Sequence, residues 1–202
     1  LTKALSISFD PNIGHDYLDD AAKRFDFYNL AEERVPFDLE SFNTITKGGL
    51  PNKTLNIALA GTGVGKSLFM CHVSAAALSQ GKNVLYLTME MSEERIAERI
   101  DANLLNVPID QLDKMTKDMF TEKVAKIKRS TGGKLIVKEY PTGSAHAGHF
   151  RALLSELKLK KQFVPDIICI DYLNICASSR MKGMGGSINS YNLIKAIAEE
   201  LR

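Results

Sequence analysis

The sequence Leu55-Asn56-Ile57-Ala58-Leu59-Ala60 runs directly into Gly61-Thr62-Gly63-Val64-Gly65-Lys66-Ser67 and then into Leu68-Phe69-Met70. This order predicts an apolar strand, a glycine-rich loop and the start of a helix, which is the layout of a P-loop. Glycines let successive backbone amides face anionic oxygens, and the following helix adds the positive end of its dipole. The stretch therefore predicts a cradle for nucleotide phosphates; the alternative is a glycine turn that binds no ligand.

The predicted phosphate-binding residues are consecutive. They are Gly61, Thr62, Gly63, Val64, Gly65, Lys66, Ser67 and Leu68. Lys66 would reach the β- and γ-phosphates, and the Ser67 hydroxyl would ligate Mg²⁺, an ion that takes a few protein oxygens together with phosphates and waters. The strict pattern has glycine at the position of Ala60. Alanine fits there if its backbone keeps a negative φ, so we expect the loop to form.

Length and charge leave several classes of protein open. The chain has 202 residues, which suits one large domain or one domain with an appendage. Hydrophobic residues make up 45% of the chain, an ordinary share for a globular protein with a proper core. Lys and Arg number 26 against 24 Asp and Glu, so the net charge of +2 neither demands nor excludes a nucleic-acid partner.

The cysteines and the apolar runs indicate the cellular compartment in which the protein works. Cys71, Cys169 and Cys176 are odd in number, and the first two lie in apolar segments where we expect them to be buried, so we expect reduced thiols. The longest apolar runs have the length of strands, and neither a signal peptide nor a membrane span is visible. These features predict a cytoplasmic protein without a membrane partner. Because the chain starts with Leu1 and not with Met, we expect a fragment or a missing start.

Strand and helix patterns alternate along the chain. The predicted strands are 55–60, 83–89, 134–140 and 166–171, and the main predicted helices are 67–79, 92–105, 119–130, 149–161 and 189–202. The strands are almost continuous apolar runs, as in parallel sheets that are buried on both faces. The pattern therefore predicts an α/β fold, in which a parallel sheet carries helices on both faces.

The N-terminal region has a different pattern. Residues 1–14 lack sustained periodicity and are predicted to be an arm. Apolar side chains then recur at helical spacing within 16–28, where Asp16 is a plausible N-cap, and the polar connector 29–37 follows. This short helix cannot bury its apolar stripe alone. It packs either on its own domain or on a neighbouring subunit.

Carboxylates stand where three predicted strands end, the edge of a parallel sheet at which ligands bind. Asp171 follows an apolar run, as a Walker B carboxylate does, and would hold Mg²⁺ opposite Ser67; the alternative is a structural carboxylate with a capping or ion-pair partner. Glu90 is the candidate for orienting the attacking water, or it complements the dipole of the helix that starts after Ser92. Glu139 is the second candidate for the catalytic base.

These motifs together resemble the motor domain of DnaB-type hexameric replicative helicases, most closely the primosome helicases of T4-like bacteriophages. The resemblance rests on Phe37-Asp38-Leu39, Gly48-Gly49-Leu50, the P-loop, the run from Leu87 to Ser92, Arg99 nine residues after Glu90, and Ile170-Asp171-Tyr172-Leu173. It covers 35–202 as an ATPase motor domain with a RecA-like P-loop core, and it leaves 1–34 as an arm and a linker helix.

The resemblance implies roles for particular residues. Glu90 would be the catalytic glutamate, acting with Lys66, and Asp171 would be the Mg²⁺ ligand. Arg99 would support the site from behind the residues that touch nucleotide. Residues 15–28 would be the linker helix that packs on the adjacent subunit.

The resemblance also implies an activity and partners. The full protein would be an ATP-driven, Mg²⁺-dependent helicase that moves 5′ to 3′ on single-stranded DNA as a hexamer, with a primase and a helicase loader as partners, in the cytoplasm of the host if it is viral. In this family a further strand, between the P-loop strand and the strand before Asp171, ends in a phosphate-sensing glutamine, and an arginine beyond it reaches the neighbouring site. Because the chain ends at Arg202, we expect a C-terminally truncated domain that binds or hydrolyses nucleotide poorly.

Two loops contain further candidates. The Gly- and Ser-rich loop 178–190 corresponds to a channel loop that holds DNA, and Arg180 and Lys182 are its candidate phosphate contacts. The alternative is a solvated loop with two basic residues. His146 and His149 are three residues apart without nearby cysteines or a further carboxylate, which favours polar loop groups over metal ligands.

Two other classes of function share part of this pattern. A RecA-type recombinase has the same core but forms open filaments, so only its assembly separates it from a ring helicase. A small-molecule kinase would also use a P-loop. The chain has no obvious Arg-rich lid, and a kinase does not explain the tethered helix at 16–28.

Overall fold

A computed structural model describes residues 14–30, 32–181 and 189–202. Contacts within the chain divide it into two units, Leu1–Glu33 and Arg34–Arg202. The second unit contains the sheet and all the motifs that predicted a nucleotide site. In the described part of the chain, no helix has both the length and the apolar character that crossing a bilayer requires.

The described part of the first unit contains one helix, α1 (Ala21–Tyr28), which begins later than predicted. Asp16 accepts hydrogen bonds from the amides of Leu18 and Asp19, both at 3.1 Å. Asp16 therefore closes a turn ahead of the helix instead of capping the helix itself. The apolar side chains of this unit are exposed: Leu18, Phe25, Phe27 and Tyr28.

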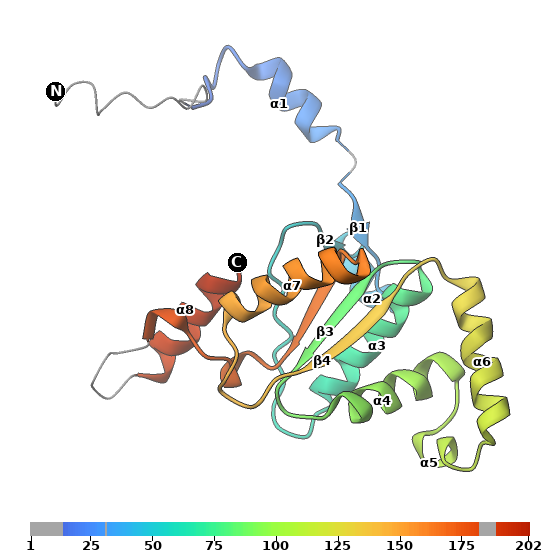
Figure 1. The fold of residues 1–202 in the computed structure, drawn as a ribbon. Coiled ribbons are helices and arrows are strands. Elements are labelled where there is room, and N and C mark those ends of the chain that lie inside the picture. The colour runs from blue at the N-terminus through green and yellow to red at the C-terminus, as the bar shows by residue number, and fades with distance from the viewer. Residues whose placement is uncertain (1–13, 31, 182–188) are drawn as a thin grey trace. The chain divides into compact units, whose positions relative to one another are not determined.

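The second unit is built on a parallel sheet of three strands (Figure 1). Its central strand is β3 (Val84–Thr88), between β4 (Leu135–Glu139) and β5 (Ile167–Asp171). The register pairs Thr88 with Glu139 on one side and with Asp171 on the other. The carboxyl ends of the three strands therefore align, as the sequence predicts.

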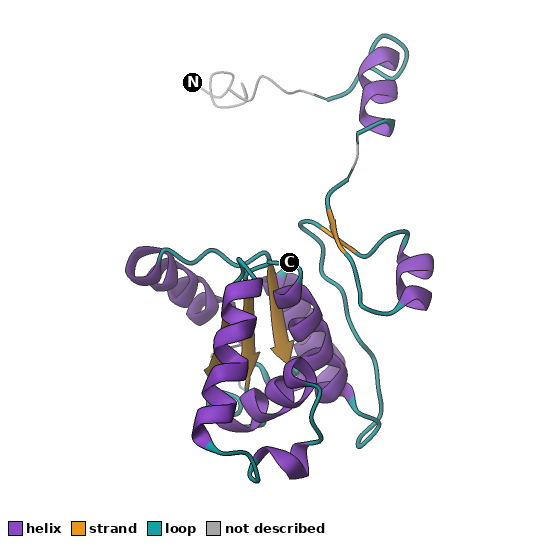
Figure 2. Cartoon of the chain, turned by 90° about the vertical axis from the view of Figure 1, so that its right-hand side faces the viewer, coloured by secondary structure: helices purple, strands orange, loops and turns teal. Residues whose placement is uncertain are grey.

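Helices cover both faces of this sheet, which confirms the predicted α/β fold (Figure 2). On one face, Leu85 and Leu87 pack with α7 (Ala147–Lys161) and α8 (Ser190–Leu201). On the other face, Tyr86 packs with α3 (Lys66–Ser79) and α4 (Glu93–Leu105). Since successive strand residues point to opposite faces, one apolar run supplies both cores. All five residues of β3 are buried.

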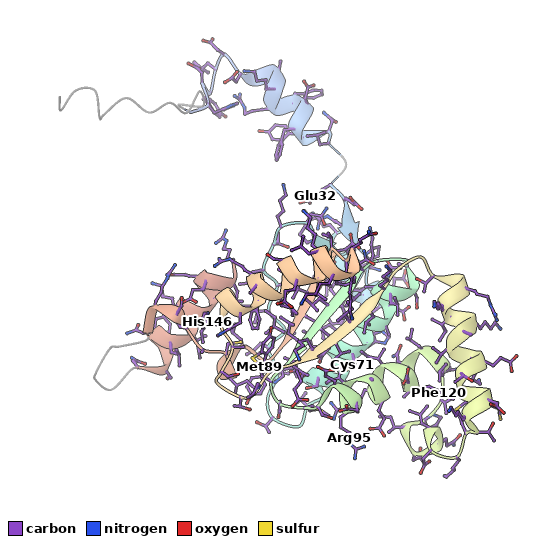
Figure 3. All side chains as sticks on the ribbon, viewed as in Figure 1. Glu32, Cys71, Met89, Arg95, Phe120 and His146 are labelled. Carbon is purple, nitrogen blue, oxygen red and sulfur yellow. The ribbon has the colours of Figure 1, made fainter. Side chains whose placement is uncertain are left out.

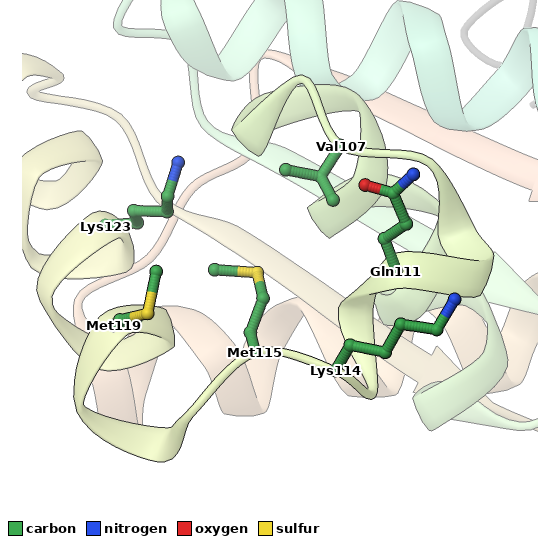
Figure 4. A pocket seen from close by; sticks show the side chains of 6 residues that line it. All are labelled: Val107, Gln111, Lys114, Met115, Met119 and Lys123. Carbon is green, nitrogen blue, oxygen red and sulfur yellow. The ribbon is translucent and has the colours of Figure 1, made fainter.

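Beyond α4 the chain forms α5 (Ile109–Leu112) and α6 (Lys117–Ser130). A hollow of about 500 Å³ lies beside them, lined by Val107, Gln111, Lys114, Met115, Met119 and Lys123. Figure 4 shows the two methionines and Val107 turned towards this space. None of the residues predicted to bind nucleotide lines the hollow, so it is separate from the P-loop.

The predicted strand 55–60 is wrong for this structure. Those residues form no strand, and Leu59 is 96% exposed and Ile57 63% exposed. A strand needs a partner for its backbone amides and carbonyls. Along the described chain, no strand pairs with this segment, and β5 is hydrogen-bonded only to β3. An apolar sequence alone therefore does not make these residues a strand.

The predicted connector 29–37 ends in a short strand. Antiparallel β1 (Arg34–Val35) and β2 (Leu50–Pro51) flank α2 (Glu40–Thr46). Gly49 has a φ of +121°, and a Cβ there would lie 2.2 Å from the carbonyl oxygen of Val35. Only glycine permits this close approach, so the Gly-Gly turn fixes how the segment folds back.

Candidate nucleotide-binding and catalytic site

The P-loop has the backbone conformation that its glycines allow. Gly63 and Gly65 have positive φ values of 75° and 106°. Ala60 does not belong to the non-glycine residues with positive φ in the described chain, so its substitution for glycine is tolerated as expected. The loop leads directly into α3, whose first intrahelical bond runs from the Phe69 amide to the Gly65 carbonyl at 2.9 Å.

The N-terminus of α3 differs from those of the other long helices. Among described helices of at least 12 residues, only α3 has no side-chain cap. The caps of the others are Ser92, Thr116, His146 and Asn189. The first amides of a helix have no intrahelical partner, and the dipole there favours an anion. The uncapped start of α3 is therefore suited to phosphate.

The structure brings Lys66 to Asp171. The Lys66 ammonium nitrogen lies 3.7 Å from Asp171 Oδ1 and 3.5 Å from the centre of the Tyr172 ring. Residues more than 100 positions apart in the sequence thus meet at the end of β5. This juxtaposition is what the Walker A and Walker B patterns predict.

Asp171 is 1% exposed, and its two oxygens have different surroundings. Oδ2 accepts a hydrogen bond from the Tyr86 hydroxyl at 2.9 Å. Oδ1 is buried, and no described residue donates a hydrogen bond to it. A buried carboxylate oxygen without a donor is costly unless a cation balances it, so the site fits a divalent ion beside Lys66.

The protein ligands for such an ion are few. In the described residues there is no group of three or more His, Cys, Asp or Glu side chains arranged to hold a metal. A protein-only cage is therefore ruled out for that part of the chain. Mg²⁺ suits the arrangement because it takes one or two protein oxygens and completes its shell with phosphates and waters.

Sequence reasoning missed Tyr86. Burial raises the pKa of its hydroxyl, and the nearby Cys71 and Asp171 raise it further, so Tyr86 stays protonated and donates to Asp171. The Cys71 thiol on α3 lies 4.0 Å from the Tyr86 oxygen, and Figure 3 labels this cysteine beside the sheet. The sequence did contain a signal for this residue, namely a tyrosine inside an otherwise apolar strand. A buried tyrosine hydroxyl needs a hydrogen-bond partner, so its position predicts a polar group nearby.

Glu90 follows β3 on a turn that is fixed from two sides. The Thr88 hydroxyl bonds the carbonyl and the amide of Met91, and the Thr142 hydroxyl donates to the Met89 carbonyl at 2.8 Å. The Glu90 side chain is exposed, and within the described chain it has no hydrogen bond or ion pair. The backbone around Glu90 is therefore held in place, and the exposed carboxylate is free to take a ligand.

The register separates Glu90 from Glu139. Both Asp171 and Glu139 pair with Thr88, on opposite sides of β3, so Glu139 lies two strands from Asp171, a separation of about 10 Å. Glu90 follows the strand next to Asp171. The Glu139 amide donates to Glu93 at 3.0 Å, which ties β4 to the start of α4. The strand order thus favours Glu90 over Glu139 as the carboxylate nearer to the phosphate site.

Comparisons with known proteins identify the family of the domain that carries this site. A sequence model of the DnaB-like helicase C-terminal domain family matches residues 35–202. The chain belongs to this family. It is 52% identical over 205 residues to a DnaB-like replicative helicase of Enterobacteria phage T4, an alignment that covers 100% of this chain and 43% of that relative. The chain therefore spans less than half the length of this helicase.

Two solved structures share the fold of this helicase domain. One is a DnaB-like replicative helicase whose interactions with primase were described, with a TM-score of 0.67 at 14% identity, covering 99% of this chain and 47% of that one. The other is the ATPase domain of a second protein, with a TM-score of 0.66 at 14% identity, covering 93% of this chain and 66% of that one. These likenesses show a RecA-like fold.

Two other predicted residues of the helicase domain lie on the helices around the P-loop. Ser67 is the second residue of α3, next to Lys66, and is half-buried. Arg99 lies on α4 and is also half-buried; burial raises the pKa of the Cys71 thiol, and the charge of Arg99 partly offsets that rise. Arg99 therefore lies near enough to Cys71 on α3 for its charge to act on that thiol.

The three cysteines are buried and free. The sequence predicted the burial of Cys71 and Cys169, and the structure adds Cys176. Burial raises the pKa of Cys169 and of Cys176 to about 11. Both thiols therefore remain protonated near neutral pH. Cys169 accepts a hydrogen bond from the Ser74 hydroxyl of α3, which joins β5 to the P-loop helix.

The base of the predicted DNA loop is held by α8. The Glu200 carboxylate accepts hydrogen bonds from the Ser178 and Ser179 hydroxyls and from the amides of Ser179 and Arg180. Although partial burial raises the pKa of Glu200, these bonds outweigh it and lower the pKa to about 2. Arg180 pairs with Glu199 at 2.7 Å, and Lys182 lies outside the described residues.

The two histidines cap α7. His146 Nδ1 accepts the Gly148 amide at 3.1 Å, and His149 Nδ1 accepts the His146 amide at 3.2 Å. This reciprocal box starts the helix at Ala147, two residues earlier than the predicted start. Figure 3 labels His146 at this position.

Proposed function

We propose that this chain supplies the ATPase motor of a replicative DNA helicase. The observation that supports this most directly is the 3.7 Å distance between Lys66 and Asp171. Lys66 lies at the uncapped start of the P-loop helix, and the chain belongs to the DnaB-like family. The organisation into an N-terminal arm with a linker helix, 1–34, and a motor domain, 35–202, is part of the proposal.

In this proposal the residues divide the work of phosphoryl transfer. The amides from Gly61 to Leu68 and the Lys66 ammonium bind the ATP phosphates, and Lys66 leaves Asp171 to do so. Ser67 and Asp171 hold Mg²⁺, which neutralises charge on the phosphates when it is bound. Glu90 orients the attacking water, and Arg99 supports the α3–α4 contact behind the loop.

The proposal extends to assembly and partners. Exposed apolar side chains on α1 support docking of this helix on an adjacent subunit, in a hexamer that encircles single-stranded DNA. The primase described with one structural relative supports a role beside a primase. The proposal also includes a helicase loader as a partner and a place in the host cytoplasm, because the chain is similar to a phage helicase. Duplex DNA at a replication fork would be the substrate.

The decisive experiment uses the full-length protein that contains this domain. ATP hydrolysis should rise when single-stranded DNA is added, and a forked DNA duplex should separate with ATP and Mg²⁺. Electron microscopy with a non-hydrolysable ATP analogue should show closed rings. Open filaments without strand separation would indicate a recombinase instead, and hydrolysis that requires a small-molecule acceptor would indicate a kinase.

Contact between DNA and the loop 178–190 is a separate part of the proposal. Changing Arg180 and Lys182 together to Ala should reduce the slope of log affinity against log salt by about 2, because each phosphate contact contributes close to one unit. Arg180 must leave Glu199 to make its contact. An unchanged slope would exclude both residues as phosphate ligands. Changing Lys158 and Lys160 on α7 to Ala is the matched control.

A further inference from the structure

Tyr86 places a fully buried hydroxyl in the sheet. This residue is at the centre of β3 and is 0% exposed. Its ring packs with Cys71, Ala75, Ile96, Ile100 and Cys169, a set that a phenylalanine would fill equally well. Packing therefore explains the ring but does not explain the hydroxyl, whose burial is costly unless it makes a hydrogen bond.

The register of the sheet explains how this hydroxyl reaches Asp171. Tyr86 pairs directly with Cys169, and Asp171 follows two residues further along β5, on the same face. Two residues of a parallel strand span about 7 Å, which is close to the reach of a tyrosine side chain along the strand. The hydroxyl therefore meets Asp171 Oδ2, at 2.9 Å.

Because of this contact, the two oxygens of Asp171 have different partners. Oδ2 is held by Tyr86, whereas Oδ1 has no hydrogen-bond donor in the described chain and lies 3.7 Å from Lys66. Without Tyr86, no described side chain would donate a hydrogen bond to the carboxylate, and only the 3.7 Å ion pair with Lys66 would orient it. The phenol thus holds one oxygen of the carboxylate, which leaves the other on the P-loop side of the site.

The hydroxyl also makes a weak contact with the P-loop helix. The Cys71 thiol donates to the Tyr86 oxygen at 4.0 Å, and Tyr86 in turn donates to Asp171. Cys71 lies five residues after Lys66 on α3. A chain of donors therefore runs from the helix that carries the P-loop, through β3, to the carboxylate at the end of β5.

We propose that Tyr86 is a positioning residue for the nucleotide-bound Mg²⁺, and that its hydroxyl orients Asp171 so that Oδ1 alone faces the ion. The inference rests on the proposed function, because it requires Asp171 to act on Mg²⁺. It assigns a role to a residue of the central strand that belongs to neither the P-loop nor the Asp171 motif. Partners that orient a metal ligand in this way typically contribute about 10- to 100-fold to metal affinity.

The test measures how Mg²⁺ and nucleotide bind to the full-length protein without turnover. A fluorescent, non-hydrolysable ATP analogue is bound in EDTA and then across a titration of MgCl₂. Tyr86→Phe should raise the half-saturating Mg²⁺ concentration about tenfold and leave the affinity for the metal-free analogue within about twofold of wild type. Tyr140→Phe is the matched control, since it removes a phenol hydroxyl at the end of β4 and should change neither value.

A double-mutant cycle shows whether Tyr86 acts through Asp171. Asp171→Asn should also raise the half-saturating Mg²⁺ concentration, and adding Tyr86→Phe to it should have less than about a twofold further effect. If Tyr86→Phe proves unstable, Cys71→Ala replaces it. That variant keeps the phenol but frees its hydroxyl, and it should shift the Mg²⁺ requirement about two- to threefold in the same direction.

The outcomes separate this inference from the proposed function. A normal Mg²⁺ requirement in Tyr86→Phe, together with a raised one in Asp171→Asn, would overturn the role of Tyr86 and leave the proposed site intact. A normal requirement in Asp171→Asn would remove the metal role of Asp171 and both proposals with it. Equal weakening of metal-free and Mg²⁺-dependent binding in Tyr86→Phe would show that the hydroxyl supports packing only.

Discussion

Asp171, at the end of β5, is 1% exposed, whereas Leu59, just before the P-loop, is 96% exposed, although both belong to apolar stretches that lead into the proposed site. The difference follows from strand pairing. β3 has a strand on each side and is fully buried, and β5 is paired with β3. The segment 55–60 has no strand partner in the described chain. Hydrophobic sequence becomes buried structure only where the backbone hydrogen bonds are also satisfied.

The two sides of the proposed site also differ in how their side chains are held. The Asp171 side is arranged in advance by Tyr86 and Cys71. The P-loop side contributes exposed amides and Lys66, which is held at Asp171 and Tyr172. We therefore expect substitutions on the P-loop side to act mainly on nucleotide, and substitutions of apolar core residues in the paired strands to act mainly on stability.

The largest expected effect is that of Lys66→Ala on the P-loop side. It removes the ammonium that is proposed to bind the phosphates, so ATP hydrolysis by the full-length protein should fall about 1,000-fold. Steady-state phosphate release measures this rate. Lys128→Ala, an exposed lysine of α6, should leave it unchanged. Hydrolysis near the wild-type rate in Lys66→Ala would contradict the P-loop assignment.

Glu90→Gln should have the next largest effect. The change keeps the shape of the side chain but removes the charge that orients water, so kcat should fall about 100-fold while the affinity for nucleotide is retained. Kinetics and equilibrium binding on the same preparation separate the two quantities. Glu139→Gln is the matched variant on the neighbouring strand. If it is the variant that stops turnover, the catalytic base is Glu139.

A pair of leucines tests the difference in burial itself. In the 202-residue chain, Leu85→Ala should lower the free energy of unfolding by about 2–5 kcal/mol, since Leu85 is 0% exposed. Leu59→Ala should lower it by less than about 0.5 kcal/mol. Urea denaturation measures both. In a longer chain that contains a partner strand for 55–60, the effect of Leu59→Ala should rise towards that of Leu85→Ala. If Leu59→Ala has the same small effect in the longer chain as in the 202-residue chain, no further strand pairs with 55–60.

The smallest expected effect concerns Glu200. Its pKa is lowered from the ordinary 4.5 to about 2, so its ionised form stabilises the folded state above pH 4.5, and this contribution is lost as the pH falls towards 2. Glu200→Gln should lower the melting temperature by about 2 °C or less at pH 7, with no difference from wild type near pH 2. Glu156→Gln, on an exposed pair with Lys160, is the control. A difference that grows on acidification would contradict the assignment.

Sequence reasoning predicted most of this fold because its patterns were long and regular. The run 83–89, the Ser92 cap and the stop at Gly81 correctly predicted β3, the start of α4 and the end of α3. The helix predicted from 16 begins instead at Ala21, because Asp16 bonds two nearby amides in a turn. Local capping chemistry of this kind has several solutions, and the pattern alone did not choose among them.

The sequence by itself determined which residues are the candidates for the chemistry. Spacing and residue type singled out Lys66, Ser67, Glu90 and Asp171, since glycine turns and strand-end carboxylates are local signals. Only the tertiary structure decided the rest. The parallel register set Tyr86 against Asp171 and placed Glu139 two strands from it, and the lack of a partner left 55–60 outside the sheet. These features depend on contacts between distant segments, and the free energy of such contacts is fixed by pairing and burial, which no local stretch of sequence specifies.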